Sequence, residues 1–423
     1  MKQVGIIGAG ASGLVAAIFA AREGASVTVF ETNLKPGKKL LMTGNGKCNL
    51  TNLSMTSECF YSEDSVFVRQ ILDAFNASET TAFFESLGVV LTEKNGYVYP
   101  YSGQAVTVLE ALCAEANRLQ VQFVFGTKIL QICPVNRKWK VTGLQEEQPF
   151  SSDLFDTCII ACGSCAAPKT GSDGALMSVI NRLSISTRDF VPALCGLHLE
   201  GKKWKAISGV RANAKVYLET SEGNLAESDG EIQFTDYGIS GIVVFQISRI
   251  ASFALANGNT VSGRIDFYPE YEDAEFEMVW QKRLAFIRRS AETGADAQSA
   301  FSGMLHSKLM SAILLEAGIH NSDAIASISE QKINRVKKLM RAFPFQVIGT
   351  NDFSQSQTAA GGVLISEIDT NLEAKTQKGL FFTGEILDVD GICGGYNLQW
   401  AWSTGFVAGK NAGGSSDVGN LAN

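Results

Sequence analysis

The sequence lacks the features that mark membrane-spanning, repetitive or strongly basic proteins. It contains no uninterrupted apolar run of about 18 residues, so we expect no membrane span and no membrane partner. No internal repeat is visible, which excludes a repeat array. Lys and Arg number 36 against 43 Asp and Glu, which leaves a net charge of −7. This balance argues against a nucleic-acid partner, although a local basic patch can hide in an acidic total.

Histidine is scarce, and the cysteines form no recognisable framework. The three histidines, His198, His306 and His320, are too dispersed to indicate a ligand cluster, and we expect no metal site. The nine cysteines are odd in number and irregularly spaced, which fits a reducing cytoplasm better than a disulfide scaffold. We therefore predict a cytoplasmic protein. With 423 residues, the chain is too long for one hydrophobic core and should divide into two or three domains.

The start of the chain carries a dinucleotide-binding pattern. A short apolar run is followed by Gly8-x-Gly10-x-x-Gly13 and then by an Ala-rich, helix-like stretch over 14–23. Gly8 permits a tight turn, Gly10 lets the backbone approach a pyrophosphate, and Gly13 lets the helix pack closely on the strand. The N-terminus of the helix offers unpaired N–H groups to the phosphates.

A second strand supports this interpretation. Residues 26–30 are strand-like and end in Glu31, whose carboxylate can accept a hydrogen bond from a ribose hydroxyl. A glycine pattern alone is weak evidence in a chain with 41 Gly, but strand, glycines, helix, strand and acid occur here in the required order. We predict a dinucleotide site rather than a structural turn.

The next stretch, residues 32–52, combines lysines and glycines with small amides and hydroxyls. This composition suits a loop whose N–H groups and Lys side chains face an anionic ligand. A solvated basic loop is the alternative, and composition does not separate the two.

The middle of the chain contains predicted helices and strands, and their arrangement changes at about residue 191. Helices are expected over 65–75, 78–87 (with Ser78 as N-cap), 104–119 and 175–183, and strands over 121–125, 128–133, 138–143 and 155–161. The strands at 121–143 suggest a meander. From about 191 the segments are short, β-like and separated by Gly, Asn and Asp, whereas 270–341 is helical in pattern, with pieces over 274–289, 297–317 and 329–341.

Near the C-terminus a predicted strand is again followed by glycines and acids and then by a helix. Residues 379–383 are strand-like, the segment 384–397 is rich in Gly and Asp, and a helix begins around Leu398. Asp388 or Asp390 could bond sugar hydroxyls, and the start of the helix could bind the electron-rich edge of a ring. A Gly-rich turn before a core helix is the competing interpretation.

Three segments carry a family resemblance. Gly37-Lys-Lys-Leu-Leu through Lys47-Cys-Asn-Leu-Thr-Asn52, Thr358-Ala-Ala-Gly-Gly-Val363 and Thr383-Gly-Glu-x-x-Asp-x-Asp-Gly-x-Cys-Gly-Gly-Tyr-Asn397 closely resemble a bacterial flavoprotein family. It is described as BaiN/RdsA-like or as the aminoacetone oxidase family of FAD-binding enzymes. The resemblance implies an α/β fold with a split, Rossmann-like FAD-binding domain over 1–190 and 346–423. It implies two insertions, a β-barrel-like module over 191–269 and a helical module over 270–345.

The resemblance also implies which residues bind FAD. At the adenylate and pyrophosphate end these are Gly8, Ala9, Gly10, Ala11, Ser12, Gly13 and Glu31. Over the pyrophosphate and flavin they are Lys38, Lys39, Thr43, Gly44, Lys47, Cys48 and Asn49, with Gly163 after the strand that returns to the sheet. At the ribityl and isoalloxazine end they are Gly384, Glu385, Asp390, Gly394, Gly395, Tyr396 and Asn397. Asn45 and Lys47 stand where the family has Gly and Arg, and Lys lacks the bidentate fork of Arg.

A departure from the family pattern creates a pair of neighbouring cysteines. Ala161-Cys162-Gly163-Ser164 replaces the usual Ala-Thr-Gly-Gly and is followed by Cys165, which makes a Cys-x-x-Cys. Such a dithiol beside a flavin could relay electrons, although small residues filling a tight turn are the more common role. A single pair is a poor zinc site.

The predicted activity is hydride transfer between FAD and a small organic substrate. The interpretation that we favour is a reductase of unsaturated, enone-like compounds that takes its electrons from NAD(P)H. The nicotinamide would dock transiently, because the chain has only one dinucleotide fingerprint. The alternatives are a flavin-dependent amine oxidase that uses O₂, an NAD-binding dehydrogenase without flavin, and a flavoprotein without turnover. An RNA modifier would need a basic face. Tyr237 and Tyr396 are candidate catalytic proton donors, and the oligomeric state is not predicted.

Overall fold

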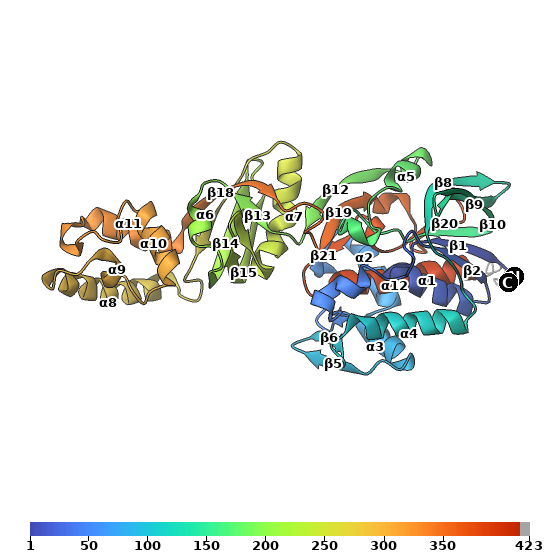
Figure 1. Cartoon of the computed structure of the whole chain (residues 1–423), viewed down its shortest axis with the longest axis horizontal. Helices are drawn as coiled ribbons and strands as arrows, with labels where there is room; N and C mark the ends of the chain where they lie inside the picture. The colour runs from blue at the N-terminus through green and yellow to red at the C-terminus, as the bar shows by residue number, and fades with distance from the viewer. Residues whose placement is uncertain (415–423) are drawn as a thin grey trace. The chain divides into compact units, whose positions relative to one another are not determined.

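The N-terminal 190 residues fold together with the C-terminal part of the chain in the computed structural model, which describes residues 1–414. These segments form the first unit, which resumes at Phe353, and residues 191–352 form a separate inserted unit (Figure 1). The boundary differs from the predicted one at 346. Strand β18 (Phe343–Thr350) pairs with two strands of the inserted unit, so the chain returns to the first unit only after residue 352.

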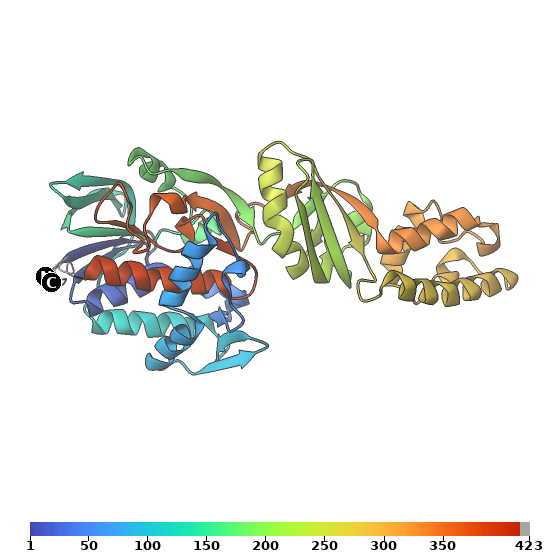
Figure 2. The same cartoon turned by 180° about the vertical axis from the view of Figure 1, so that it is seen from behind.

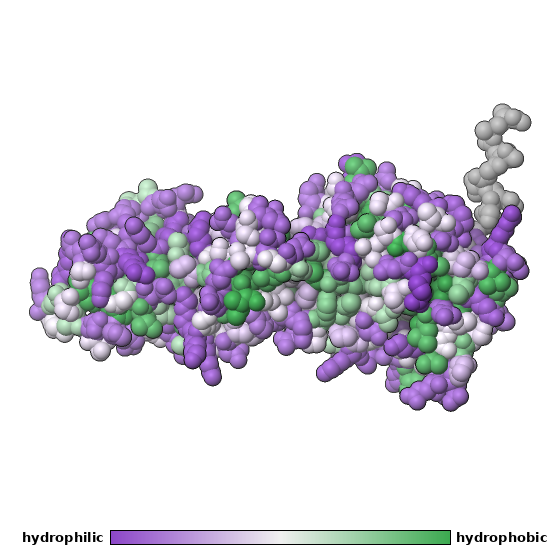
Figure 3. Space-filling view, turned by 90° about the horizontal axis from the view of Figure 1, so that it is seen from above, coloured by the Kyte–Doolittle hydropathy of each residue, from purple (hydrophilic) through white to green (hydrophobic). Residues whose placement is uncertain are grey.

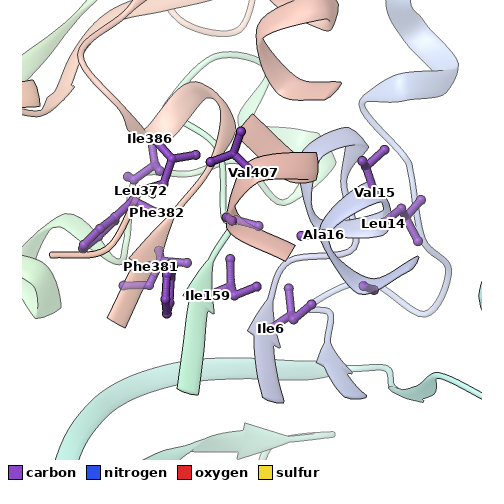
Figure 4. Packing of buried hydrophobic residues seen from close by; sticks show 14 of the residues in the cluster. Ile6, Leu14, Val15, Ala16, Ile159, Leu372, Phe381, Phe382, Ile386 and Val407 are labelled. Atoms are coloured by element: carbon purple, nitrogen blue, oxygen red, sulfur yellow. The ribbon is translucent and has the colours of Figure 1, made fainter. Parts of the chain in front are cut away.

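A parallel sheet forms the centre of the first unit. Its strand order is β20-β11-β1-β2-β7, with bounds Leu380–Phe382, Thr157–Ile160, Gln3–Ile7, Ser26–Phe30 and Gln122–Val124. All four pairings are parallel, and the central strands are buried on both faces, which explains their continuous apolar sequence. Figure 4 shows Ile6, Ile159 and Phe381 side by side on three neighbouring strands, with Ala16 and Val407 from helices in the same cluster.

Two helices from opposite ends of the sequence pack together on this sheet. They are α1 (Ala11–Arg22) and α12 (Tyr396–Gly413). Their contact consists of small residues: a Cβ on Gly405 would lie 2.6 Å from the carbonyl oxygen of Ser12, and a Cβ on Gly413 would lie 2.6 Å from that of Ala20. Glycine is therefore required at these positions for the backbones to approach. The predicted split domain depends on this contact.

Smaller elements surround the sheet. The helices are α2 (Ser65–Ala74), α3 (Ala77–Ser86), α4 (Ala105–Arg118) and α5 (Met177–Arg182). The small sheets are β3-β6-β5 (Thr51–Asn52, Tyr97–Pro100, Leu91–Lys94), β10-β9-β8 (Gln148–Phe155, Lys138–Gln145, Thr127–Val135), β12-β19 (Thr187–Ala193, Thr358–Val363) and β21-β4 (Asp390–Gly391, Phe60–Tyr61).

Two local predictions for this unit are wrong. The N-cap of α3 is Asn76 rather than Ser78, because Asn76 and Glu79 form a reciprocal capping box. The strand predicted over 121–125 joins the parallel sheet as β7 instead of the meander, whose third strand is β10. The pairing partner of a strand depends on tertiary packing, which its own sequence does not contain.

The inserted unit contains a closed barrel with the strand order β13-β16-β15-β14-β17-β18. Besides β18, the strands are β13 (Leu197–Leu199), β14 (Arg211–Thr220), β15 (Leu225–Phe234), β16 (Gly238–Ser240) and β17 (Val261–Asp266). Its helices are α6 (Lys203–Ala206), α7 (Ile242–Ala256), α8 (Asp273–Glu292), α9 (Ala297–Ala300), α10 (Ser307–Glu316) and α11 (Glu330–Arg341), seen from behind in Figure 2. The predicted β-rich and helical modules thus share one unit. The single helix predicted over 297–317 is divided, and Gly303 has a φ of +81° in the turn between its halves.

Hydrophilic residues cover most of the face shown in Figure 3, and hydrophobic residues form smaller patches on it. Across residues 1–414, no helix combines the length and the apolar character that a membrane crossing requires.

Candidate functional site

A cleft opens at the carboxyl ends of the parallel strands, where ligands bind in sheets of this kind. It holds about 1370 Å³, including space open to solvent, and lies entirely within the first unit. Twelve of the predicted cofactor residues line it: Gly8, Ala9, Gly10, Ala11, Ser12, Glu31, Lys38, Lys39, Thr43, Gly163, Glu385 and Asn397. The other ten are not among its lining residues: Gly13, Gly44, Lys47, Cys48, Asn49, Gly384, Asp390, Gly394, Gly395 and Tyr396.

The glycine turn leaves room for a phosphate. A Cβ on Gly8 would lie 2.4 Å from the carbonyl oxygen of Ala161, and one on Gly13 would lie 2.0 Å from that of Gly8. These two glycines therefore allow the close packing of turn, strand and helix. Gly10 is different, because no atom lies within 4 Å of the position of its absent Cβ. No side chain caps the N-terminus of α1, so its N–H groups remain available to an anion.

Glu31 is buried and bound by the backbone around it. Its Oε2 accepts a hydrogen bond of 2.9 Å from the Ala9 N–H, which fixes the acid to the glycine turn. Its Oε1 accepts bonds of 2.8 and 2.7 Å from the backbone and side-chain nitrogens of Asn33. A carboxylate has about four acceptor positions, so one position remains for a hydroxyl. Asn33, which the sequence analysis missed, also lines the cleft and donates to the Thr170 carbonyl.

An ion pair connects the lysine-rich loop with the C-terminal segment. Lys39 Nζ binds Glu385 Oε2, and both side chains are partly exposed and line the cleft. Glu385 Oε1 also accepts hydrogen bonds from the Thr358 hydroxyl and from the Ala359 N–H. Through its ion pair with Lys39 and its hydrogen bond with Thr358, Glu385 links all three segments that carry the family resemblance.

The start of α12 forms the far end of the cleft. Gly395 is its N-cap with a φ of +95°, and no side chain caps the helix. The Asn397 amide exchanges two 2.8 Å hydrogen bonds with the backbone of Gly391, which holds the preceding turn in place. Trp400 lines the cleft, and its buried indole Nε1 has no hydrogen-bond partner among the described residues. The far end therefore presents uncapped N–H groups.

Among the predicted loop residues outside the lining, Asn49 packs against this helix start. The carbonyl oxygen of the Asn49 side chain is buried without a partner among residues 1–414, and it lies 3.0 Å from where a Gly395 Cβ would be. Cys48 is buried, and burial raises the pKa of its thiol to about 12. Lys47 is exposed. Asn49 therefore supports the helix start, and none of these three residues belongs to the cleft wall.

The segment after β11 contributes lining residues that the sequence analysis missed. They are Thr170, Gly171, Ser172, Asp173, Gly174, Ala175 and Leu176, opposite Thr127, Lys128 and Ile129 of β8. Their position could have been expected, because they follow the carboxyl end of a central parallel strand. Gln357 and Leu398, the latter in the first turn of α12, also line the cleft. No sequence pattern marked either of them as a cleft residue.

Both members of the Cys162-x-x-Cys165 pair are free thiols, and Cys162 lines the cleft. Burial raises the pKa of Cys162 to about 12 and also raises that of Cys165. A protonated thiol is a poor nucleophile, so the structure offers no activated cysteine at this turn. Within residues 1–414 no group of three His, Cys, Asp or Glu side chains converges as a metal site.

The two candidate tyrosines differ in their surroundings. Tyr396 is buried, and its burial raises the pKa of the phenol to about 12. Tyr237 lies in the inserted unit, where its hydroxyl accepts a 3.3 Å bond from Asn351, and the Asn351 oxygen lies 2.8 Å from His198 Nε2. The rings of His198 and Tyr237 stack with centroids 4.6 Å apart. Because the Tyr237 oxygen accepts from Asn351, its hydrogen can be donated to a ligand.

The residues present fit FAD. The space over Gly10 admits a pyrophosphate, Glu31 can take a ribose hydroxyl, and the cleft continues to the uncapped start of α12. The open N–H groups at the start of α12 are donors suited to the oxygen and nitrogen edge of a flavin ring.

The fold and this cleft define a class of protein, the Rossmann-type FAD-dependent oxidoreductases. The sequence profile of the HI0933-like protein Rossmann domain matches residues 2–411. The chain therefore belongs to the HI0933-like family, which confirms the predicted family and the predicted α/β fold with a barrel module.

Several relatives match this chain nearly end to end. The 3-dehydro-bile acid delta(4,6)-reductase of Clostridium scindens is 38% identical over 97% of this chain and 99% of that protein. The ribosomal RNA dihydrouridine synthase of Haemophilus influenzae is 28% identical over 95% of this chain and 96% of that protein. Among solved structures, the 3-ketosteroid delta1-dehydrogenase of Sterolibacterium denitrificans has a TM-score of 0.50 at 12% identity, covering 98% of this chain and 100% of that one. That likeness shows the fold alone.

Proposed function

We propose that this chain is a reductase that uses FAD and NAD(P)H to reduce a carbon–carbon double bond conjugated to a carbonyl group. The observation that carries the proposal is one continuous cleft that is lined by the uncapped starts of both α1 and α12. The match to a bile acid reductase over nearly the whole chain supports the substrate class.

The chain's own residues bind and orient the cofactor in this proposal. The α1 N–H groups and the open face of Gly10 hold the pyrophosphate, and Glu31 holds the adenosine ribose. Lys39 and Glu385 keep the loop and the C-terminal turn together beside the cleft. The N–H groups at the start of α12 face the flavin edge and stabilise negative charge there. When bound, FAD supplies hydride transfer at N5 of its isoalloxazine.

Anaerobic reduction tests the proposal. The purified protein is expected to retain the visible absorbance of oxidised flavin through gel filtration. NADH or NADPH should bleach that absorbance, and a cyclic enone should then restore it. Reduction of the flavin by an amine, with reoxidation by O₂ but not by enones, would favour the amine oxidase alternative. A colourless protein that binds NAD would favour the dehydrogenase without flavin.

A second candidate substrate is uridine in RNA. The match to a ribosomal RNA dihydrouridine synthase favours it, and the double bond reduced in uridine is also conjugated to a carbonyl. The acidic net charge argues against it. Reoxidation of the reduced protein by ribosomal RNA, with loss of the RNA signal at raised salt, would support this candidate over a small enone.

The two tyrosines remain proposed proton donors, and Tyr237 is the better candidate because its hydroxyl hydrogen is available. Tyr237→Phe should lower the rate of enone reduction by about tenfold or more while leaving flavin reduction by NAD(P)H unchanged. Tyr396→Phe provides the comparison, and a loss of FAD in that variant would indicate a structural role instead.

A further inference from the structure

Strand β6 places two tyrosines on one face of its small sheet. Tyr97 and Tyr99 are half-buried, whereas Val98 and Pro100 between and after them are buried on the opposite face. This alternation is that of a strand with one face on the core, yet the outer face carries aromatic rings. Figure 1 shows β6 beside β5 in the first unit.

The turn before α12 packs against these tyrosines. A Cβ on Gly394 would lie 2.9 Å from the Tyr97 ring, so glycine lets the ring approach the backbone. The side-chain amide of Asn52, which pairs with Tyr97 across the strands, donates a 3.4 Å hydrogen bond to the Gly394 carbonyl. The tyrosine-bearing sheet is thus fixed to the far end of the cleft.

Cys393 and Gln357 connect this face with the cleft. Gln357 lines the cleft and is exposed, and its Oε1 lies 3.9 Å from the Cys393 thiol. Cys393 is close enough to Tyr99 to influence its pKa. Each of Gln357, Cys393, Tyr99 and Tyr97 therefore lies near the next, starting from Gln357 in the cleft lining, and we call these four residues the tyrosine wall.

The tyrosine wall is uncharged. Burial and the neighbouring groups Tyr97 and Cys393 raise the pKa of Tyr99, so the phenol stays protonated at neutral pH. The thiol pKa of Cys393 is raised by burial as well. The facing strand β5 carries two exposed ionisable groups, Glu93 and Lys94. Lys94 pairs with Tyr97, whereas Glu93 pairs with Val98 of the opposite face. Phenol hydroxyls and an amide can donate to a neutral carbonyl oxygen, and the aromatic rings can stack on a flat ring.

The cofactor's reactive end should lie next to this wall. Glu31 defines the adenosine end of the cleft, so an extended FAD places its ring at the opposite end, by Gln357 and Leu398. On the basis of the proposed function, we propose that the tyrosine wall binds the substrate, a flat, uncharged, ring-shaped conjugated ketone.

Binding to the oxidised holoprotein tests the wall without turnover, because a ketone cannot be reduced when no reductant is present. The probe is a fused-ring 3-keto-4-ene, and the signal is the perturbation of the flavin spectrum. Tyr97→Ala and Tyr99→Ala should each weaken binding by about tenfold, and the double variant by more. Tyr97→Phe should retain most of the stacking contribution. Tyr101→Ala is the matched control, because Tyr101 is an exposed tyrosine just beyond the strand. This variant should bind the ketone as tightly as the unmodified protein does.

FAD content and the rate of flavin reduction by NAD(P)H distinguish failure of the wall from failure of the proposed function. FAD content should be unchanged in the wall variants, and the rate of flavin reduction is measured on the unmodified protein. Unchanged ketone affinity in the double variant would overturn the wall, and so would no ketone binding to the unmodified protein. Wall-dependent binding of a uridine oligonucleotide in place of the ketone would also overturn it. If NAD(P)H fails to reduce the flavin, the proposed electron source is wrong while wall-dependent ketone binding still supports the wall.

Discussion

Gly409 and Ala16 are in direct backbone contact although 393 positions separate them: a Cβ on Gly409 would lie 2.4 Å from the Ala16 carbonyl oxygen. This contact is the centre of the small-residue seam between α12 and α1. It holds the glycine turn before α1 and the start of the final helix beside one cleft.

Gly409→Ala should lower the free energy of unfolding by about 1–3 kcal/mol, because the added methyl group has no space in a backbone contact. Lys410→Ala, on the exposed side of the same helix, should change it by less than about 0.5 kcal/mol. Urea unfolding of the apoprotein measures both. Equal stability of the two variants would show that the helices separate more easily than the structure indicates.

Gly10→Ala should weaken FAD binding by about tenfold or more without destabilising the apoprotein, because the methyl group enters only the space proposed for the pyrophosphate. Gly13→Ala should instead destabilise the fold itself, since its Cβ would lie 2.0 Å from the Gly8 carbonyl oxygen. Flavin titration and thermal unfolding separate the two effects. Undiminished FAD affinity in Gly10→Ala would place the phosphates elsewhere.

Glu31→Gln should weaken FAD binding by about tenfold, because an amide presents one oxygen where the carboxylate presents two acceptors. Its NH₂ group would face either the Ala9 N–H or the Asn33 donors. Glu23→Gln removes the same charge from an exposed position and is the control. If both variants bind FAD equally well, Glu31 supports neither the turn nor the ribose.

Glu115 makes the contact between α4 and α1 sensitive to acid. Hydrogen bonds from Arg118 and from Arg22, with the charges of both, lower its pKa from 4.5 to about 2. A depressed pKa in the folded state means that the stabilisation is complete above pH 4.5 and is lost as the pH falls toward 2. Glu115→Gln should therefore cost about 1–2 kcal/mol at pH 7 and progressively less below pH 4.5.

Urea unfolding across this pH range measures the effect. Glu110→Gln, at an exposed position of the same helix, should show no such pH-dependent difference. A constant difference between Glu115→Gln and the unmodified protein at every pH would show that packing rather than charge is lost.

Cys162 should react slowly with iodoacetamide at pH 8 in the native protein, because its thiol pKa of about 12 leaves little thiolate. The exposed Cys133 should be alkylated at least about tenfold faster, and unfolding should remove the difference. Mass spectrometry of the alkylated peptides follows each site. Rapid reaction of Cys162 would support the redox role of the Cys-x-x-Cys pair.

Local patterns made the nucleotide site predictable. The strand, the glycines and Glu31 are neighbours in sequence, and the conformations that they require are properties of those residues themselves. The positions lining the cleft from Gly8 to Ser12 followed from this pattern alone. The boundary of the inserted unit did not, because it depends on the pairing of β18 with β13 and β17.

The sequence by itself determined the nucleotide fingerprint, the family and the chemical character of the C-terminal turn, since each depends on the order of residues along a short stretch. The tertiary structure decided which of the predicted residues line the cleft, and it added Asn33, the loop after β11, Gln357 and the tyrosine wall. The physical reason is that backbone conformation is a local property. Contacts such as Gly409 with Ala16 form only when two distant surfaces are complementary, and neither surface specifies its partner.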